Sequence, residues 1–288
     1  MRIGFLGYGE AARAFHEGLA RPGLSVCAHD ILLDADEGAM RAAMEERGAT
    51  PVSLSGLADM DWIISAVTAD QSLLAVEPLL ARLRRGQTLI DINSVSPGRK
   101  RETAQRIEAA GGHYLDMAVM APVHPKKHAT PVLIAGAPAA AMLPHLLDLG
   151  FSASIAGEAA GAATAIKMVR SLFVKGLEAI TVEALLAARA SGCFDEILAS
   201  LSSSYPGLGW PDFAAYQFER TTRHGKRRAA EMEESAATLD ALGLNGGLAR
   251  EIARVQALMG KSGPVLEGDG LETTAANALE GRLAVDKP

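Results

Sequence analysis

The chain has 288 residues, of which 49% are hydrophobic and 5% aromatic, so we expect a large core built mainly from Ala, Leu, Val and Ile. Its formal net charge of −6 argues against a general nucleic-acid binder. Cys27 and Cys193 are the only cysteines, which excludes a disulfide framework and a cysteine-based zinc site. No apolar run reaches the length of about eighteen residues that a membrane span needs, and the first predicted strand leaves no room for a signal peptide. We therefore expect a soluble, cytoplasmic protein without a bound metal.

The N-terminus combines an apolar strand with a glycine turn. Residues 3–6 are strand-like, the pattern Gly7-x-Gly9-x-x-Ala12 follows, and Ala-rich helical sequence continues to about residue 20. This is the dinucleotide-binding fingerprint, in which the first Gly permits a tight turn and the second lets a pyrophosphate approach the backbone. The helix that begins there presents free N–H groups and a positive dipole end to the phosphates. The candidate cofactor-binding residues of this turn are Gly7, Tyr8, Gly9, Glu10 and Ala11.

A second predicted strand over residues 25–29 ends in Asp30, about twenty residues beyond the glycines. An acid at this place accepts the ribose hydroxyls of NAD and repels the 2′-phosphate of NADP. The sequence therefore predicts NAD as the preferred cofactor, with NADP possible because His29 adjoins the acid. The alternative, a βαβ turn without a ligand, is disfavoured by the complete order of strand, glycines, helix, strand and acid.

Strands and helices alternate through the first half of the chain. The helices are predicted over residues 35–47, 70–85 and 98–110, and the strands over residues 52–53, 62–67, 88–92, 113–119 and 131–135, with a turn or short helix over residues 57–60. This alternation predicts an α/β fold with a doubly wound, Rossmann-type parallel sheet that is covered on both faces.

The pattern changes near Gly157. Residues 158–191 form a long Ala-rich helical pattern without proline, and the remaining sequence is helical with breaks at Gly192, 205–211, Gly243 and Gly260. We therefore predict a dinucleotide-binding domain over residues 1–156 and an all-α domain for substrate binding and dimerisation over residues 157–288. The tail over residues 286–288 is expected to fray.

Ligands of doubly wound sheets bind beyond the carboxyl ends of the strands. We expect Val67 and Thr68 to line the adenosine side of the site. Asn93 and Ser94 would offer an amide and a hydroxyl near the nicotinamide. Alternatively, residues 94–97 cap the next helix, and one residue can serve both purposes.

The long helix carries Lys167, Ser171, Lys175 and Glu178 at spacings of four, four and three residues, with Arg170 beside them. Side chains at these spacings lie on one face of a helix. They form either a functional cluster or the solvated face of an amphipathic helix, and the pattern alone leaves both open.

Four blocks of sequence resemble the β-hydroxyacid dehydrogenase superfamily, whose members combine the dinucleotide half of 6-phosphogluconate dehydrogenase with a helical domain. They are the turn at residues 7–12, the segment 91–97 where the family has Asp-x-Ser-Thr, the segment 116–122 where it has Asp-Ala-Pro-Val-Ser-Gly-Gly, and the Gly-x5-Lys spacing of residues 161–167. The segment 220–234 resembles a poorly characterised branch of the superfamily, related to 6-phosphogluconate dehydrogenase.

The resemblance implies that Lys167 is the catalytic acid and base, and that residues 120–122 and 170–171 stand where the family contacts its substrate. Together with the residues indicated by strand ends, helix spacing and charge, the candidate substrate contacts are Ser94, Met120, Ala121, Pro122, Arg170, Ser171, Lys175 and His224. The sequence departs from the family pattern at two places: Met120-Ala121-Pro122 replaces Ser-Gly-Gly, and Arg170-Ser171 replaces an Asn pair. The His that precedes this Asn in 6-phosphogluconate dehydrogenase is also absent, which argues against sugar-phosphate decarboxylation.

The implied function is an NAD(P)-dependent oxidoreductase that transfers hydride between the cofactor and a small anionic hydroxyacid or its carbonyl form. Burial and neighbouring cations are expected to lower the pKa of Lys167 and so make it a base. Two further groups either attract the anion or form solvated surface, namely the loop of His124, Lys126, Lys127 and His128, and the group of His224, Arg227 and Arg228. The resemblance also implies a homodimer. The alternative function is a non-catalytic NAD(P)-binding sensor or scaffold of the same fold.

Overall fold

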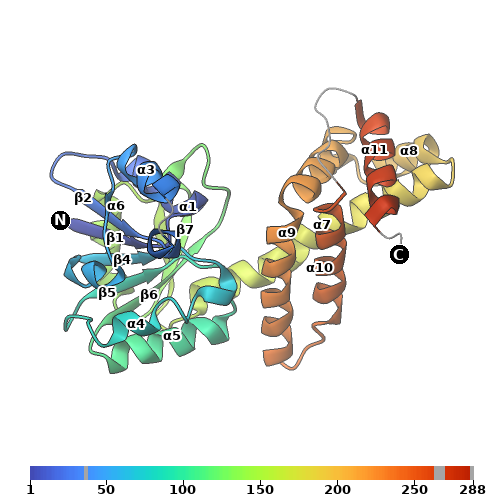
Figure 1. Cartoon of the computed structure of the whole chain (residues 1–288). Helices are drawn as coiled ribbons and strands as arrows, with labels where there is room; N and C mark the ends of the chain where they lie inside the picture. Colours follow the sequence, from blue (N-terminus) through green and yellow to red (C-terminus); the bar gives the residue numbers. More distant parts are fainter. Residues whose placement is uncertain (36–37, 263–269, 286–288) are drawn as a thin grey trace. The chain divides into compact units, whose positions relative to one another are not determined.

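The computed structural model describes residues 1–35, 38–262 and 270–285, and the chain divides into two compact units (Figure 1). Unit 1 is Met1–Lys167 and unit 2 is Met168–Pro288. Helix α7 (Ala162–Ala190) begins in unit 1, so its first turns, including Lys167, belong with the sheet. The boundary between residues 156 and 157 stays a prediction.

Unit 1 is built on a sheet whose eight described strands have the order β3-β2-β1-β4-β5-β6-β7-β8. Their bounds are β1 Arg2–Leu6, β2 Ser25–His29, β3 Thr50–Pro51, β4 Trp62–Ser65, β5 Thr88–Asp91, β6 His113–Val119, β7 Val132–Ala135 and β8 Ala153–Gly157. All neighbours run parallel except β6 and β7, which are antiparallel. The predicted doubly wound parallel sheet is therefore confirmed for the six strands β3, β2, β1, β4, β5 and β6, whereas β7 and β8 run antiparallel to them. Residues 120–131 join β6 to β7 through a loop that contains the short 3-10 helix η3 (Lys127–Ala129) instead of the α-helix that usually connects parallel neighbours.

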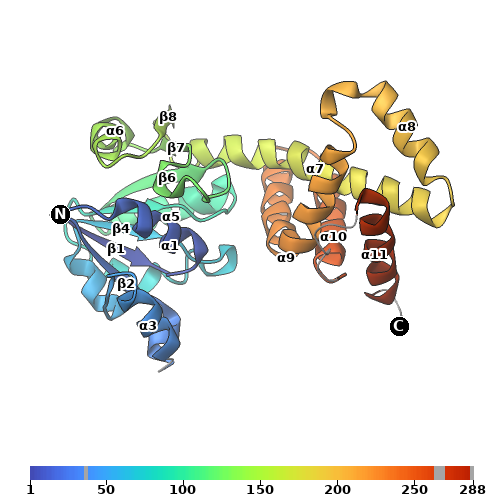
Figure 2. The same cartoon turned by 90° about the horizontal axis from the view of Figure 1, so that it is seen from above.

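Helices cover both faces of this sheet, as Figures 1 and 2 show. Helices α1 (Glu10–Leu19), α3 (Gly38–Glu45) and α6 (Ala139–Asp148) pack on one face in a cluster that includes Phe5, Ile64 and Ile90. The 3-10 helix η1 (Leu54–Asp59), α4 (Glu77–Leu80) and α5 (Pro97–Ala109) pack on the other face with Ile63 and Leu89. Successive strand residues thus point to opposite faces, and both faces are apolar because both are covered.

Several predicted elements differ from the observed ones. The helix over residues 70–85 is replaced by η2 (Ala69–Gln71) and the single-turn α4, because Pro78 cannot donate within a continuous helix and starts a new one instead. The helix over residues 35–47 is replaced by α2 (Ile31–Asp34) and α3, with residues 36–37 outside the described ones. Strand β3 pairs with β2 at residues 50–51 instead of 52–53. Helix α6 and the edge strand β8 were not predicted from the sequence.

The described part of unit 2 is helical, which confirms the all-α prediction (Figure 2). After α7 come α8 (Phe194–Ser204), the 3-10 helix η4 (Pro206–Leu208), α9 (Asp212–Ala241), α10 (Gly247–Met259) and α11 (Gly270–Val285). The breaks fall at the predicted glycines and at residues 205–211. The predicted frayed tail lies outside the described residues. Within those residues, none of the helices is both long and apolar enough to span a bilayer.

Candidate active site

The glycine turn between β1 and α1 has the geometry that a dinucleotide requires. Gly7 has φ of +86°, and a Cβ there would lie 2.6 Å from the carbonyl oxygen of Ala66, so this position accepts only glycine. A Cβ added at Gly9, by contrast, would have no heavy atom within 4 Å, and α1 begins at the next residue. The space around Gly9 and the N–H groups at the start of the helix therefore fit a pyrophosphate.

Asp30 is held at the end of β2 by two backbone N–H groups. The N–H of Tyr8 donates to Oδ2 at 2.8 Å, and the N–H of Leu32 donates to Oδ1 at 3.1 Å. One bond links the carboxylate to the glycine turn and the other caps α2. A carboxylate fixed in this way has oxygen lone pairs left for the ribose hydroxyls of a bound cofactor.

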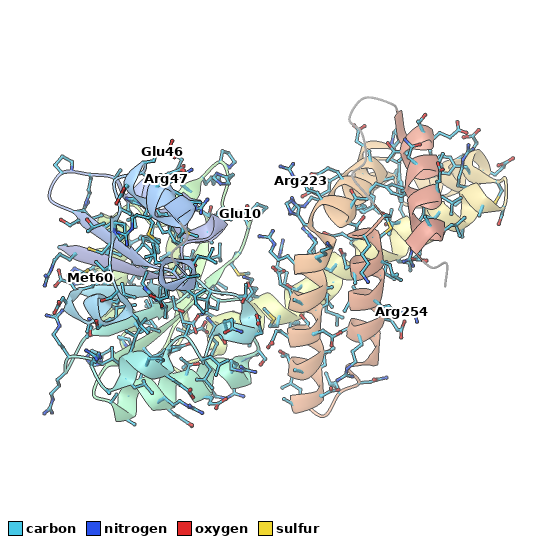
Figure 3. The ribbon with its side chains drawn as sticks, in the orientation of Figure 1. Glu10, Glu46, Arg47, Met60, Arg223 and Arg254 are labelled. Carbon is cyan, nitrogen blue, oxygen red and sulfur yellow. The ribbon has the colours of Figure 1, made fainter. Side chains whose placement is uncertain are left out.

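The other predicted residues of the turn differ in exposure. Glu10 is exposed at the start of α1 (Figure 3), and Ala11 is half-buried against the core. The Tyr8 side chain points inward, where its hydroxyl lies 2.7 Å from Nδ1 of His16. Burial raises the pKa of Tyr8 and lowers the pKa of His16, so both groups remain neutral near pH 7. Tyr8 therefore belongs to the turn through its backbone.

Asn93 ties together the carboxyl ends of β4 and β5. Its Oδ1 accepts from the N–H of Val67 at 2.7 Å, and its Nδ2 donates to Oγ of Ser65 at 2.9 Å. Thr68 is exposed at the start of η2. The buried amide of Asn93 thus shapes the loop at Val67, and its contact with a nicotinamide stays a prediction.

Beneath these loops, Lys100 of α5 is fully buried with two aspartates. Its Nζ lies 2.7 Å from the carbonyl oxygen of Asp91, 2.9 Å from Oδ1 of Asp91 and 3.5 Å from Oδ1 of Asp116. Tyr114 donates its hydroxyl to Oδ2 of Asp91 at 2.6 Å, and burial, followed by the charge of Asp91, raises the pKa of Tyr114 well above its usual value. This buried ion-pair group was not predicted from the sequence, because Lys100 stands between Arg99 and Arg101 in a segment whose charge is typical of a solvent-exposed helix. The signal that could have revealed it is the pair of acids, Asp91 and Asp116, within two otherwise apolar strands, since buried acids need a partner.

Asp116 also binds the start of α7. Its Oδ2 accepts from the N–H of Gly161 at 3.1 Å and from the N–H of Thr164 at 3.0 Å, while its Oδ1 accepts from the Thr164 hydroxyl at 2.7 Å. These N–H groups belong to the first turn of the helix, where intrahelical partners are missing and negative charge is favoured. The carboxylate thus caps α7 from strand β6.

Lys167 and Ser94, which were predicted separately, are in direct contact. Nζ of Lys167 donates to Oγ of Ser94 at 2.7 Å, just beyond the carboxyl end of β5. Ser96 occupies the N-cap position of α5, and its side chain makes no capping hydrogen bond. The hydroxyl of Ser94 faces the lysine, while Ser96 and Pro97 form the start of α5, so this segment leads into the helix and also presents a hydroxyl at the site.

The segment 120–122 and the basic loop lie close to other parts of unit 1. Met120 is half-buried in a small apolar cluster with Ala163, next to the capped turn of α7, and Ala121 and Pro122 are exposed.

In the basic loop, the His128 ring packs edge-on against Phe151 with centroids 5.3 Å apart, and its Nε2 lies 3.1 Å from the carbonyl oxygen of Leu149. Burial lowers the pKa of His128, so it carries little charge near pH 7. Lys127 pairs with Glu17 at 3.5 Å, and His124 and Lys126 are exposed.

In unit 2, two of the predicted cations, Lys175 and Arg228, are paired with carboxylates. Nζ of Lys175 lies 2.8 Å from Glu231 and donates to Oγ of Ser171 at 3.2 Å, and the lysine is 6% exposed. Arg170 is exposed. Burial, followed by Arg220, Arg227 and Arg228, lowers the pKa of His224. Arg228 forms a buried ion pair with Glu178, which also accepts from Gln256. Figure 3 shows Arg223 and Arg254 pointing away from α9 and α10.

The family model described as the NAD binding domain of 6-phosphogluconate dehydrogenase matches residues 2–150. The chain belongs to this family. A second model, described as a domain of unknown function (DUF1932), matches residues 188–259. The chain therefore carries an NAD-binding domain, as the glycine turn predicts. The helices over residues 188–259 match a domain whose function is not assigned.

Solved structures similar to the chain have the same overall fold. A conserved hypothetical protein from Sinorhizobium meliloti is 32% identical, with a TM-score of 0.77 over 98% of this chain and 96% of that one. The 3-hydroxyisobutyrate dehydrogenase of Mycobacterium tuberculosis, solved with L-serine, is 18% identical with a TM-score of 0.72, covering 96% of this chain and 98% of that one. At 18% identity this second likeness concerns the fold alone.

The curated relatives match a smaller part of the chain. An uncharacterised 28.5 kDa protein of Methanothermus fervidus is 29% identical over 174 residues, which is 60% of this chain and 66% of that protein. The mitochondrial 3-hydroxyisobutyrate dehydrogenase of mouse is 21% identical over 212 residues, which is 72% of this chain and 63% of that protein. The chain thus spans just under two thirds of the length of these relatives. Across the described ranges, no group of three or more His, Cys, Asp or Glu side chains is placed to hold a metal ion.

Proposed function

We propose that this family member is an NAD(P)-dependent oxidoreductase that interconverts a small anionic hydroxyacid and its carbonyl compound, with NAD preferred. The observation that carries this proposal is the 2.7 Å contact between Nζ of Lys167 and Oγ of Ser94. It lies at the carboxyl end of β5, in the same unit as the glycine turn and Asp30. Doubly wound sheets bind their ligands at this end of the strands.

The residues of the chain would supply proton transfer and charge stabilisation, while the bound cofactor accepts or returns the hydride. When an alcohol is oxidised, a proton must leave its oxygen, and Lys167 in the neutral form can accept it. In the charged form the same side chain can stabilise an alkoxide and return the proton. Ser94 accepts a hydrogen bond from Nζ and retains its own hydroxyl proton to donate to a substrate oxygen.

Two relatives support the choice of a hydroxyacid. The mouse and Mycobacterium tuberculosis relatives are 3-hydroxyisobutyrate dehydrogenases, and the latter was solved with L-serine. Both compounds combine a carboxylate with a hydroxyl on the third carbon. In this chain Lys167 and the exposed Arg170, three residues further along α7, are the candidate groups for a negative charge.

We further propose that the protein acts in the cytoplasm as a homodimer. Support comes from α7, where Val169, Phe173 and Ile180 are 54%, 70% and 67% exposed. Their spacing of four and seven residues places them on one side of the helix, and exposed apolar stripes of this kind mark protein interfaces.

One observation favours the second candidate, a non-catalytic NAD(P)-binding sensor or scaffold. The buried pairing of Lys175 with Glu231 and Ser171 removes one of the cations expected to bind the substrate. A protein that binds only the cofactor has no need of that charge.

The two functions are separated by a turnover screen that follows NADH absorbance. The panel contains 3-hydroxyisobutyrate, L-serine and 3-hydroxypropionate, each with its neutral amide as the matched control. We expect turnover of at least one acid, with kcat/KM at least about tenfold above that of its amide, which is about 1.4 kcal/mol of charge recognition. Equal values for acid and amide would contradict the anionic substrate. Tight NADH binding without turnover of any compound would support the sensor.

A further inference from the structure

Asp91 and Asp116 are partners in the register of β5 and β6, and both side chains are buried. Two neighbouring carboxylates repel each other strongly in a buried setting unless cations or N–H groups compensate them. Lys100 supplies one positive charge between them, at 2.9 Å from Asp91 and 3.5 Å from Asp116. One negative charge in the group is then left for another partner.

That partner is the start of α7. Asp116 accepts three hydrogen bonds from Gly161 and Thr164, and the N-terminus of a helix carries a partial positive charge of about half an elementary charge. The cap is supplied from 45 and 48 positions away in the sequence rather than by a residue next to the helix. A local cap stabilises a helix wherever it lies, whereas this one fixes α7 against strand β6.

The same helix carries Lys167 three residues after Thr164, and the neighbouring strand β5 leads into Ser94. We propose that Asp116 is a positioning residue for Lys167, acting through Gly161 and Thr164, and that Lys100 orients the Asp116 carboxylate for this task. These contacts fix the position of the first turn of α7 along the helix axis, and its rotation about that axis, relative to β5. Both must be right for Nζ of Lys167 to meet Oγ of Ser94 at 2.7 Å. The chemical importance of this placement rests on the proposed function.

The test uses Thr164→Val, which removes the hydroxyl bound to Asp116 and keeps the side-chain shape and the backbone N–H. Thr164→Ser restores the hydroxyl and serves as the rescue. Thr103→Val in α5 is the matched control, because Thr103 is equally buried but its hydroxyl donates only to Arg99 of its own helix. Asp116→Asn is the stronger variant, since it replaces an accepting oxygen with a donating NH₂ group.

The readout does not require turnover. Trace acetylation with isotope-labelled acetic anhydride is followed by mass spectrometry of the peptide that contains Lys167, with the exposed Lys126 as internal standard. We expect the Lys167 labelling rate to change by about two- to tenfold in Thr164→Val, the effect of one ordinary hydrogen bond on an equilibrium. Thr164→Ser and Thr103→Val should label as the wild type does, and NADH affinity should be unchanged in all three.

If a substrate is found, kcat of Thr164→Val should fall by a similar factor at unchanged KM, and Thr164→Ser should recover it. Equal labelling of Lys167 in wild type, Thr164→Val and Asp116→Asn would overturn the positioning role. So would an equal effect of Thr103→Val, which would mean general loosening of unit 1. An absence of turnover together with changed labelling would contradict the proposed function and leave the positioning role supported.

Discussion

Gly161 lies directly against Pro97, the first residue of α5, so that a Cβ on Gly161 would come within 2.8 Å of the Pro97 carbonyl oxygen. Its φ of +92° is also unfavourable for any other residue. The capped start of α7 and the segment that follows Ser94 thus touch through backbone atoms. This contact, together with the Asp116 cap, explains why a glycine stands six residues before Lys167.

We expect Gly161→Ala to destabilise the protein and to displace Lys167 from Ser94. Gly23→Ala is the matched control, because Gly23 has φ of +81° but no atom within 4 Å of the added Cβ. The control should lose about 1–2 kcal/mol from backbone strain alone. Gly161→Ala should lose more in urea unfolding and should lower kcat at least about tenfold, consistent with misplacement of a reacting group. Equal unfolding energies for the two variants would contradict the close contact.

The carboxylate of Asp30 should set the cofactor preference. Asp30→Ser keeps a capping oxygen for α2 and removes the negative charge that would face a 2′-phosphate. We expect NADH affinity to fall and NADPH affinity to rise, measured by fluorescence titration. Wild-type protein that binds NADPH more tightly than NADH would show that the prediction is wrong.

His16 should make the stability depend on pH. Its pKa is lowered by burial beneath the ordinary value of 6.5, so the unfolded chain takes up a proton before the folded one does as the pH falls. The stabilisation is complete above about pH 6.5 and is lost progressively below it, with a slope of up to about 1.4 kcal/mol per pH unit. In urea unfolding between pH 7 and 5, His16→Gln should show a smaller slope than wild type. A slope that His16→Gln leaves unchanged would refute the assignment.

Phe173 should support the homodimer. It is 70% exposed on α7, and a glutamate there would place charges at the centre of a self-complementary interface. We expect light scattering at micromolar concentration to give a dimer for wild type and a monomer for Phe173→Glu. Leu147→Glu, at a 51% exposed site on α6, should remain dimeric. A wild-type monomer would exclude the dimer.

Strands β1, β2, β4, β5 and β6 and the helical second unit followed from periodicity and glycine positions, because those signals are local. The antiparallel β7 did not, since its direction depends on a loop without a crossover helix. Helix α6 was hidden by Pro144 within it, and the predicted helix over residues 70–85 failed because Pro78 starts a new element.

For the site, the sequence indicated Gly7, Asp30, Ser94 and Lys167 one by one, and the structure brings the last two into contact. Lys100 could not be recognised, because its burial depends on two acids that only the pairing of β5 and β6 places together. The pairing of Lys175 with Glu231 is likewise a tertiary contact, between α7 and α9, that spacing along one helix cannot reveal.

In the proposed function, Lys167 transfers the proton of the reaction. Lys167→Ala removes the amine, and Lys167→Arg keeps a positive charge that cannot act as a base near neutral pH. The most direct measurement is kcat of both variants on a substrate found in the screen, with NADH affinity as the control for intact cofactor binding. We predict that kcat falls by about two to four orders of magnitude in both variants, the usual contribution of a positioned acid–base group, while NADH affinity is unchanged. Near wild-type kcat in either variant would contradict the account.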